Sequence, residues 1–208
     1  MPTIDLAFKL MGTRMPVDHG YALYAAISRV VPEIHDAKDI GVHPVRGRFD
    51  GNECLLLSPA SRLIVRTQDD RIREFLKLAG KMIEVDGHRS RVGVPEVRAL
   101  RPAAALYARL VTIKGFMEPE QFLDAARRQL EAMGATAKLE LGERRTFRVK
   151  DKQVVGFEML AMELEAEDSL KLQEIGIGGR RRMGCGVFVP QRKHEGAIET
   201  QARNEING

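Results

Sequence analysis

The sequence is short of aromatic residues, of cysteine and of long apolar runs. Aromatic residues make up 5% of the 208 residues and tryptophan is absent, so an aromatic platform for stacking single-stranded RNA is poorly supplied. The two cysteines, Cys54 and Cys185, are far apart and lack metal-ligand spacing, which favours buried free thiols in a reducing compartment. No apolar run approaches the roughly 18 residues that a membrane span needs, and no signal-peptide core is recognisable. We therefore expect no membrane association and a cytoplasmic location.

The chain does contain enough apolar residues for a core, together with an excess of basic residues. Apolar residues account for 44% of the sequence, the net charge is +4 and the pI is about 9.2. A length of 208 residues suits one large domain or two small ones. Many arginines occur in small clusters, and arginine is favoured where planar, bidentate contacts to phosphate are needed. The charge therefore inclines the protein towards polyanionic partners.

The most informative segment is the glycine-rich loop, residues 176–186, which precedes a short apolar run. It carries five glycines and three consecutive arginines. Glycines allow backbone bends and close backbone approach, and arginines suit phosphate oxygens, so the loop is predicted to hold a phosphodiester backbone. A structural turn with solvated arginines is the alternative. The predicted RNA-binding residues are Gly176, Gly178, Gly179, Arg180, Arg181, Arg182, Gly184 and Gly186.

Two familiar phosphate-binding motifs do not account for this loop. The GxxxxGK[ST] spacing of a nucleotide-triphosphate loop is absent. A strand rather than a helix is expected after the glycines, whereas a dinucleotide fingerprint opens a helix. The loop is therefore a third kind of polyanion-binding candidate.

Hydrophobic periodicity divides the chain into two halves that follow the same plan. Each half reads as a strand, a helix, further strands, a short helix and a last strand, which is the split βαβ arrangement of a ferredoxin-like domain. In the first half, strands are expected at 3–11, 40–47, 53–57, 62–66, 81–85 and 90–94, and helices at 21–31 and 69–78. In the second half, strands are expected at 106–114, 136–140, 145–149, 153–164 and 185–189, and helices at 118–133 and 168–173.

The predicted fold is therefore α+β, with two tandem ferredoxin-like (RRM-like) domains and a C-terminal glycine-rich loop. The first domain is expected at residues 1–97 and the second at 106–190. Residues 98–105 are the expected linker. Residues 191–208 are polar and aperiodic, so we expect a disordered tail there. This fold hosts many functions and decides none of them.

The glycine-rich loop at the end of a second ferredoxin-like domain resembles that of the CRISPR-associated endoribonucleases of the Cas-six family. The family pattern, Gly-x-Gly-x-x-(Arg/Lys)-x-x-Gly-x-Gly-apolar, is filled without a gap by six residues of this chain: Gly176, Gly178, Arg181, Gly184, Gly186 and Val187. The stretches 18–21 and 32–35 resemble the myxobacterial-type subgroup. The resemblance covers about residues 2–190.

What the resemblance implies is the processing of CRISPR precursor repeat RNA into guide RNAs. The 2′-hydroxyl attacks the adjacent phosphate and the 5′-oxygen leaves, giving 2′,3′-cyclic phosphate and 5′-hydroxyl ends. Such a reaction needs a base, an acid and cationic stabilisation, and histidine suits the acid/base work near neutral pH. We expect no metal ion and no cofactor. The implied partners are a repeat-RNA hairpin and other CRISPR-associated complex subunits.

Three residues near the first helix are candidates for the catalytic site. His35 follows that helix, where several family members carry the catalytic histidine. His19 lies at the start of the same helix, and Tyr21 could orient a ribose or phosphate. The family's other branches place a histidine three residues after the tyrosine, where this chain has Tyr24, which fits the apolar stripe of a core helix.

Several further residues complete the set of candidates. His43 is a third choice of histidine, while His88 is expected in a solvated turn and His194 in the tail. Lys38 or Arg46 could supply positive charge near the scissile phosphate. Two other functions stay open: a catalytically inactive repeat-RNA-binding subunit of a CRISPR ribonucleoprotein, and a double ferredoxin-like domain for a small ligand or for protein assembly.

Overall fold

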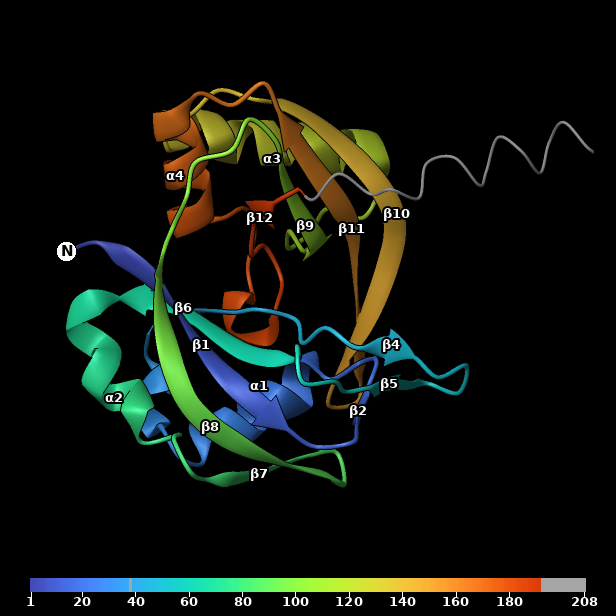
Figure 1. Ribbon diagram of the computed structural model, residues 1–208. Helices are drawn as coiled ribbons and strands as arrows, with labels where there is room; N and C mark the ends of the chain where they lie inside the picture. Colours follow the sequence, from blue (N-terminus) through green and yellow to red (C-terminus); the bar gives the residue numbers. More distant parts are fainter. Residues whose placement is uncertain (38, 192–208) are drawn as a thin grey trace, which may run out of the picture.

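The computed structural model describes residues 1–37 and 39–191 (Figure 1). Lys38, His194 and all of the predicted tail except Gln191 lie outside the described residues. Within the described part of the chain, no helix has the length and apolarity needed to cross a bilayer.

The N-terminal half forms a five-stranded antiparallel sheet with two helices. The strands run in the order β3-β6-β1-β8-β7, which is the ferredoxin-like order with β7 added as an edge strand. Their bounds are β1 (Thr3–Met11), β3 (Gly41–Val42), β6 (Arg62–Gln68), β7 (Met82–Val85) and β8 (His88–Ala99). The helices α1 (Gly20–Ser28) and α2 (Ile72–Leu76) pack on this sheet through one shared hydrophobic cluster.

The alternation of β1 explains how this core forms. Leu6, Phe8 and Leu10 are fully or nearly fully buried and share a cluster with Ile27 of α1 and Phe75 of α2. Successive side chains of a strand point to opposite faces, so the polar residues between them lie on the other face of the sheet. Each fully buried apolar side chain contributes about 1.5–3 kcal/mol relative to exposure.

The C-terminal half repeats the topology with a four-stranded sheet in the order β10-β11-β9-β12. Its strands are β9 (Leu106–Val111), β10 (Lys138–Val149), β11 (Lys152–Met162) and β12 (Val189–Pro190). Its helices are α3 (Pro119–Ala132) and α4 (Ala166–Ile175), and a second hydrophobic cluster lies beneath them. The prediction of two tandem ferredoxin-like domains is therefore confirmed.

Short elements fill the space around the first sheet. The strands β2 (Arg14–Pro16), β4 (Arg48–Phe49) and β5 (Cys54–Leu56) form a small three-stranded sheet in the order β2-β5-β4. Three 3-10 turns complete the chain: η1 (Pro32–His35), η2 (Asp69–Arg71) and η3 (Arg181–Met183). Figure 1 shows the segment from α4 to β12, which carries η3, descending between the two large sheets.

Four predicted strands differ from the observed ones. The segment 40–47 is a strand only at Gly41–Val42, because its backbone then turns to contact other parts of the molecule: the amide of Val45 donates to the His19 ring. The two strands expected at 136–149 are one strand with a register shift between Leu141 and Arg144. The last strand is limited to Val189–Pro190 because the glycine-rich loop occupies the residues before it.

A buried ionic network connects the two domains. Arg66 of β6 is 1% exposed and holds both carboxylate oxygens of Asp5, through Nε at 2.8 Å and Nη2 at 3.0 Å. Its Nη1 donates to the backbone oxygens of Gln173 and Phe188 in the second domain. Because a buried guanidinium must be fully hydrogen-bonded, Arg66 fixes the position of the second domain on the first sheet.

Candidate active site and nucleic-acid interface

His35, Tyr24 and Arg182 come together where the first helix, the turn η1 and the glycine-rich loop meet. The hydroxyl of Tyr24 lies 2.7 Å from Nδ1 of His35, and the two rings meet edge to face. The guanidinium of Arg182 lies over the Tyr24 ring, 5.6 Å from its centroid, and its Nη1 donates to the backbone oxygens of Ile34 and His35. The loop of the second domain is thus fastened directly beside an imidazole of the first.

The geometry of this cluster leaves reactive groups open to the solvent. His35 is exposed and only its Nδ1 is hydrogen-bonded within the described residues, so Nε2 is free to exchange a proton with a bound ligand. A hydrogen bond at one ring nitrogen sets the orientation and the protonation of the other. Nε and Nη2 of Arg182 contact no acceptor in the described part of the chain, so a planar pair of donors is available next to His35.

The glycines of the loop serve close packing within the protein. At Gly178, with φ +79°, an added Cβ would lie 2.3 Å from the backbone oxygen of Thr112. At Gly186, with φ +64°, it would lie 2.2 Å from the backbone oxygen of Ile177. Gly176, with φ +71°, is equally restricted, since an added Cβ would lie 2.3 Å from the backbone oxygen of Gly186. Gly184 is buried with φ +87°, and the nearest atom to its added Cβ is on the Pro44 ring at 3.3 Å. Gly179 differs, since it is exposed and nothing lies within 4 Å of its added Cβ.

The three consecutive arginines have three different environments. Arg180 is exposed, with a left-handed backbone at φ 63°. Arg181 is 8% exposed and its guanidinium lies 3.4 Å from the backbone oxygens of Asp39 and Gln173. Burial, followed by repulsion from Arg66, lowers the pKa of Arg181 to about 10. In this structure Arg181 supports the domain interface, and the exposed phosphate-binding candidates are Arg180 and the free donors of Arg182.

His19 is a buried structural residue. Its Nδ1 donates to the backbone oxygen of Pro16 at 2.8 Å, and its Nε2 accepts the amide of Val45 at 2.9 Å. Both ring nitrogens are therefore occupied, and the side chain is 2% exposed. Burial lowers the pKa of His19 from its ordinary value of 6.5. The structure thus offers no free ring nitrogen for the catalytic role considered for His19.

This arrangement predicts a pH-dependent contribution of His19 to stability. Below pH 6.5 the unfolded chain takes up a proton at His19, whereas the folded protein resists it because a protonated Nε2 would face the Val45 amide. The free energy of unfolding should therefore fall by up to about 1.4 kcal/mol per pH unit from this group as the pH drops. Urea unfolding of His19→Gln at pH 5 and 7 should show a shallower dependence, with His88→Gln as the control. An unchanged dependence in His19→Gln would contradict the assignment.

The remaining candidates take no part in the hydrogen bonds of the His35 cluster among the described residues. Tyr21 is half-buried against the first core. His43 is 7% exposed and contacts Asp5 at 3.2 Å within the Arg66 network. Burial lowers its pKa, against the attraction of Asp5. His88 lies beside Cys54, with Nε2 at 3.9 Å from Sγ.

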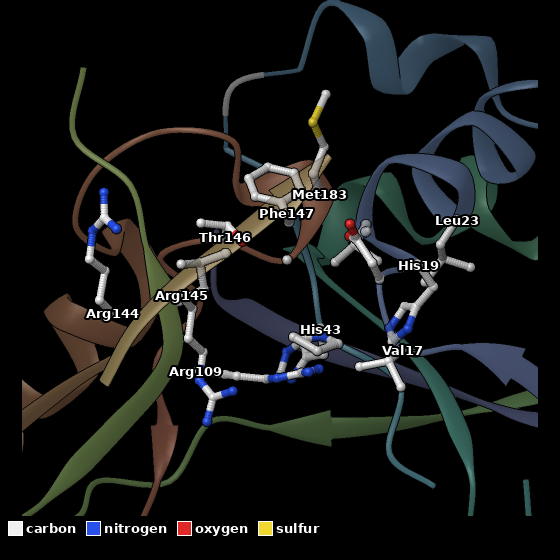
Figure 2. A pocket seen from close by; sticks show the side chains of 16 residues that line it. Val17, His19, Leu23, His43, Arg109, Arg144, Arg145, Thr146, Phe147 and Met183 are labelled. Atoms are coloured by element: carbon white, nitrogen blue, oxygen red, sulfur yellow. The ribbon is translucent and has the colours of Figure 1, made fainter. Parts of the chain in front are cut away.

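Two cavities lie between the domains. The small interdomain cavity, about 330 Å³, is lined by the start of α1, by His43–Pro44, by Arg109 and residues 144–147 of the second domain, and by Met183–Gly184 (Figure 2). The large cavity, about 1400 Å³, has five arginines besides Arg66 in its lining. These are Arg46, Arg48, Arg62, Arg98 and Arg101. Both cavities therefore present positive charge at the domain interface.

Sequence reasoning missed two parts of the site. Tyr24 was assigned to the core, and it is 9% exposed, yet its hydroxyl reaches His35. No periodic signal links positions 11 residues apart across a helix end and a turn. Arg109 was not predicted as a site residue because it is a single arginine within a predicted strand and belongs to no arginine cluster or motif. In the part of the chain that the structure describes, no group of three or more His, Cys, Asp or Glu side chains is placed to bind a metal ion.

The chain has two tandem ferredoxin-like domains, and the glycine-rich loop of the second is fastened to the first beside an exposed histidine. These features define the class of tandem ferredoxin-like proteins with a C-terminal glycine-rich loop. The family model described as Cas6 Crispr matches residues 4–193. The chain is 42% identical over 190 residues to the CRISPR-associated endonuclease Cas6 of Myxococcus xanthus (strain DK1622), covering 91% of this chain and 82% of that protein. The chain belongs to the Cas6 family.

Solved structures agree in fold at low sequence identity. A Cas6-related protein from Pyrococcus furiosus superposes with a TM-score of 0.64 and 15% identity, covering 92% of this chain and 100% of that chain. Thermus thermophilus Cse3, solved with an RNA representing a pre-cleavage complex, superposes with a TM-score of 0.53 and 16% identity, covering 91% of this chain and 98% of that chain. These likenesses support the domain architecture described above.

Proposed function

We propose that this protein is a metal-independent endoribonuclease that cuts CRISPR precursor repeat RNA into guide RNAs. The observation that carries the proposal is the exposed imidazole of His35, oriented by the Tyr24 hydroxyl at 2.7 Å and flanked by the Arg182 guanidinium. The 42% identity to a protein named an endonuclease supports the same conclusion. The cytoplasm is the proposed place of action, and other CRISPR-associated subunits are the proposed recipients of the product.

The proposed reaction is an intramolecular transesterification. The ribose 2′-oxygen attacks the adjacent phosphorus, the bond from phosphorus to the 5′-oxygen breaks, and a 2′,3′-cyclic phosphate and a 5′-hydroxyl result. His35 Nε2 exchanges a proton with one of the two reacting oxygens, as a general base towards the 2′-hydroxyl or a general acid towards the 5′-oxygen. The free donors of Arg182 stabilise the negative charge that develops on the phosphate oxygens. Arg180, exposed on the same loop, binds the neighbouring backbone.

The ends of the product test this proposal. The purified protein is incubated with its repeat RNA in excess EDTA, and the products are analysed by mass spectrometry and by labelling of their ends. We expect cleavage in EDTA with a 2′,3′-cyclic phosphate and a 5′-hydroxyl. An RNA with a single 2′-deoxyribose before the cut should bind equally well and remain intact, because the attacking oxygen is missing.

Three results would contradict the proposal. Cleavage that requires a divalent cation, or that leaves a 3′-hydroxyl and a 5′-phosphate, would replace the mechanism with hydrolysis by an activated water. Tight binding of the repeat without any cleavage would make the protein a catalytically inactive RNA-binding subunit. No RNA affinity at low ionic strength would remove the nucleic-acid function altogether.

A further inference from the structure

The small interdomain cavity contains an arginine side chain, Arg109, that no hydrogen bond or ion pair of the described residues engages. Arg109 of β9 is half-buried and lines the cavity, and it has no hydrogen bond or ion pair with any described residue. Figure 2 shows the side chains of Arg109, Arg145, His19 and His43 among those that line the cavity. A partly buried guanidinium without a partner is costly, so the arrangement favours an external anion.

The nearby carboxylates are already engaged. Glu158 accepts the hydroxyl of Tyr107 and the guanidinium of Arg145. Burial and Glu158 raise the pKa of Tyr107 to about 12, so this hydroxyl remains a donor. Asp18, which also lines the cavity, accepts the backbone amide of Arg148 at 2.8 Å. Burial, and then repulsion from Arg145, lower the pKa of Arg109 despite these two carboxylates.

The shape and walls of the cavity indicate the size of the ligand. Its volume of about 330 Å³ is at the lower end of the range for small-molecule sites, roughly 300–1,000 Å³. Val17, Leu23 and Phe147 give it apolar walls, which strengthen an ionic contact by excluding water. Arg144 is exposed on the rim. A single nucleotide unit fits a cavity with Arg109 inside, Arg144 at the rim and apolar walls, in which the Asp18 carboxylate already accepts a backbone amide.

We propose that the small interdomain cavity is a nucleotide subsite in which Arg109 binds one backbone phosphate of the RNA. The cavity is lined by Met183 and Gly184, which directly follow the Arg182 that contacts His35. An RNA strand lying along the glycine-rich loop therefore passes from one site to the other. This inference rests on the proposed RNA-binding function. In it, Arg109 contacts a phosphate away from the cut and contributes to the affinity for RNA, and it takes no part in the proton transfers.

Binding of an uncleavable RNA tests the subsite independently of cleavage. The probe is the repeat RNA with a 2′-deoxyribose at the cut, measured by fluorescence anisotropy over a series of salt concentrations. Arg109→Gln should bind about tenfold more weakly, and the slope of log Kd against log salt should decrease by about 1 for the lost phosphate contact. Arg91→Gln, which removes an exposed arginine outside both cavities, should bind like wild type.

Inorganic phosphate is the second probe and separates a free anion from RNA. Millimolar phosphate should raise the melting temperature of the wild type and have a smaller effect on Arg109→Gln. If Arg109→Gln does not fold, Arg109→Lys is used for the binding measurement. Lysine keeps the positive charge, so the slope of log Kd against log salt should stay as in the wild type. Lysine lacks the planar fork of donors, so the affinity should fall, but by less than in Arg109→Gln. Wild-type affinity and slope in the Arg109 variant would overturn the proposal. Phosphate binding at Arg109 with unchanged RNA affinity would also overturn it, since the occupant would then be a free anion.

Discussion

His35→Ala is expected to reduce the rate of repeat-RNA cleavage by about 10²- to 10⁴-fold, the contribution typical of general acid–base catalysis. The variant should still bind the RNA, because the side chain is exposed and carries no part of either core. The rate is measured in single turnover with enzyme in excess, so that weakened binding does not lower it. A His35→Ala enzyme that cuts at the wild-type rate would exclude this imidazole from the reaction.

Two matched variants make this result specific. Tyr24→Phe keeps the ring in the core and under Arg182 while removing the hydroxyl that orients His35, so we expect a smaller loss of rate and a shifted pH–rate profile. His88→Gln removes a histidine that lies beside Cys54 and makes no contact with the His35 cluster among the described residues, so this variant should cut normally. If Tyr24→Phe leaves both rate and profile unchanged, the hydroxyl has no part in orienting the imidazole.

Replacing Arg66 by methionine is expected to lower the free energy of unfolding by about 3–5 kcal/mol, the cost of breaking a buried ion pair from one side. The loss leaves the Asp5 carboxylate and the backbone oxygens of Gln173 and Phe188 without their donor. The measurement is urea unfolding at neutral pH. Arg98→Met is the control, because its pair with Glu96 is exposed and should leave the urea midpoint close to the wild-type value.

The same network predicts that the free energy of unfolding decreases at acid pH. Burial alone would raise the pKa of Asp5, but the hydrogen bonds from His43 and Arg66 outweigh burial and hold that pKa well below its ordinary value of 3.8. The stability from Asp5 is therefore present above pH 3.8 and is lost as the pH falls below it. An Arg66→Met protein with the wild-type urea midpoint would show that the network does not hold the domains together.

Local patterns were sufficient to predict the regular parts of the fold. The alternation in 3–11 matches β1 because its apolar positions face one core. The glycine at 134 and the proline at 119 bracket α3 as expected for helix ends. The segments 43–47 and 185–188 were wrongly predicted as strands because their backbone groups bond within a loop or to isolated partners elsewhere in the chain. Cys185 donates its amide to Arg180 in the same loop, and Gly186 donates to Leu110 of β9.

The sequence predicted those site residues that belong to a recognisable local motif or to a position known from the family, and it did not predict pairs of residues that meet only in the folded protein. His35 was selected from the resemblance to the family, and the loop was selected from its own glycines and arginines. The structure places the two side by side. The Asp5–Arg66 pair was not recognised, although the two residues stand directly opposite each other in the register of β1 and β6. Opposite charges on paired strands become visible only when the pairing is known, and the two positions are separated by 61 residues.

The packing of the glycine-rich loop determines how a mutational scan of this protein should be interpreted. Alanine at Gly178 or Gly186 would push a main-chain oxygen aside, so lost activity at these positions would report damage to the scaffold and say nothing about ligand contact. Gly179 has space for a methyl group and stands next to Arg180 on the open surface. Position 179 is therefore the glycine at which a scan can probe the RNA path itself.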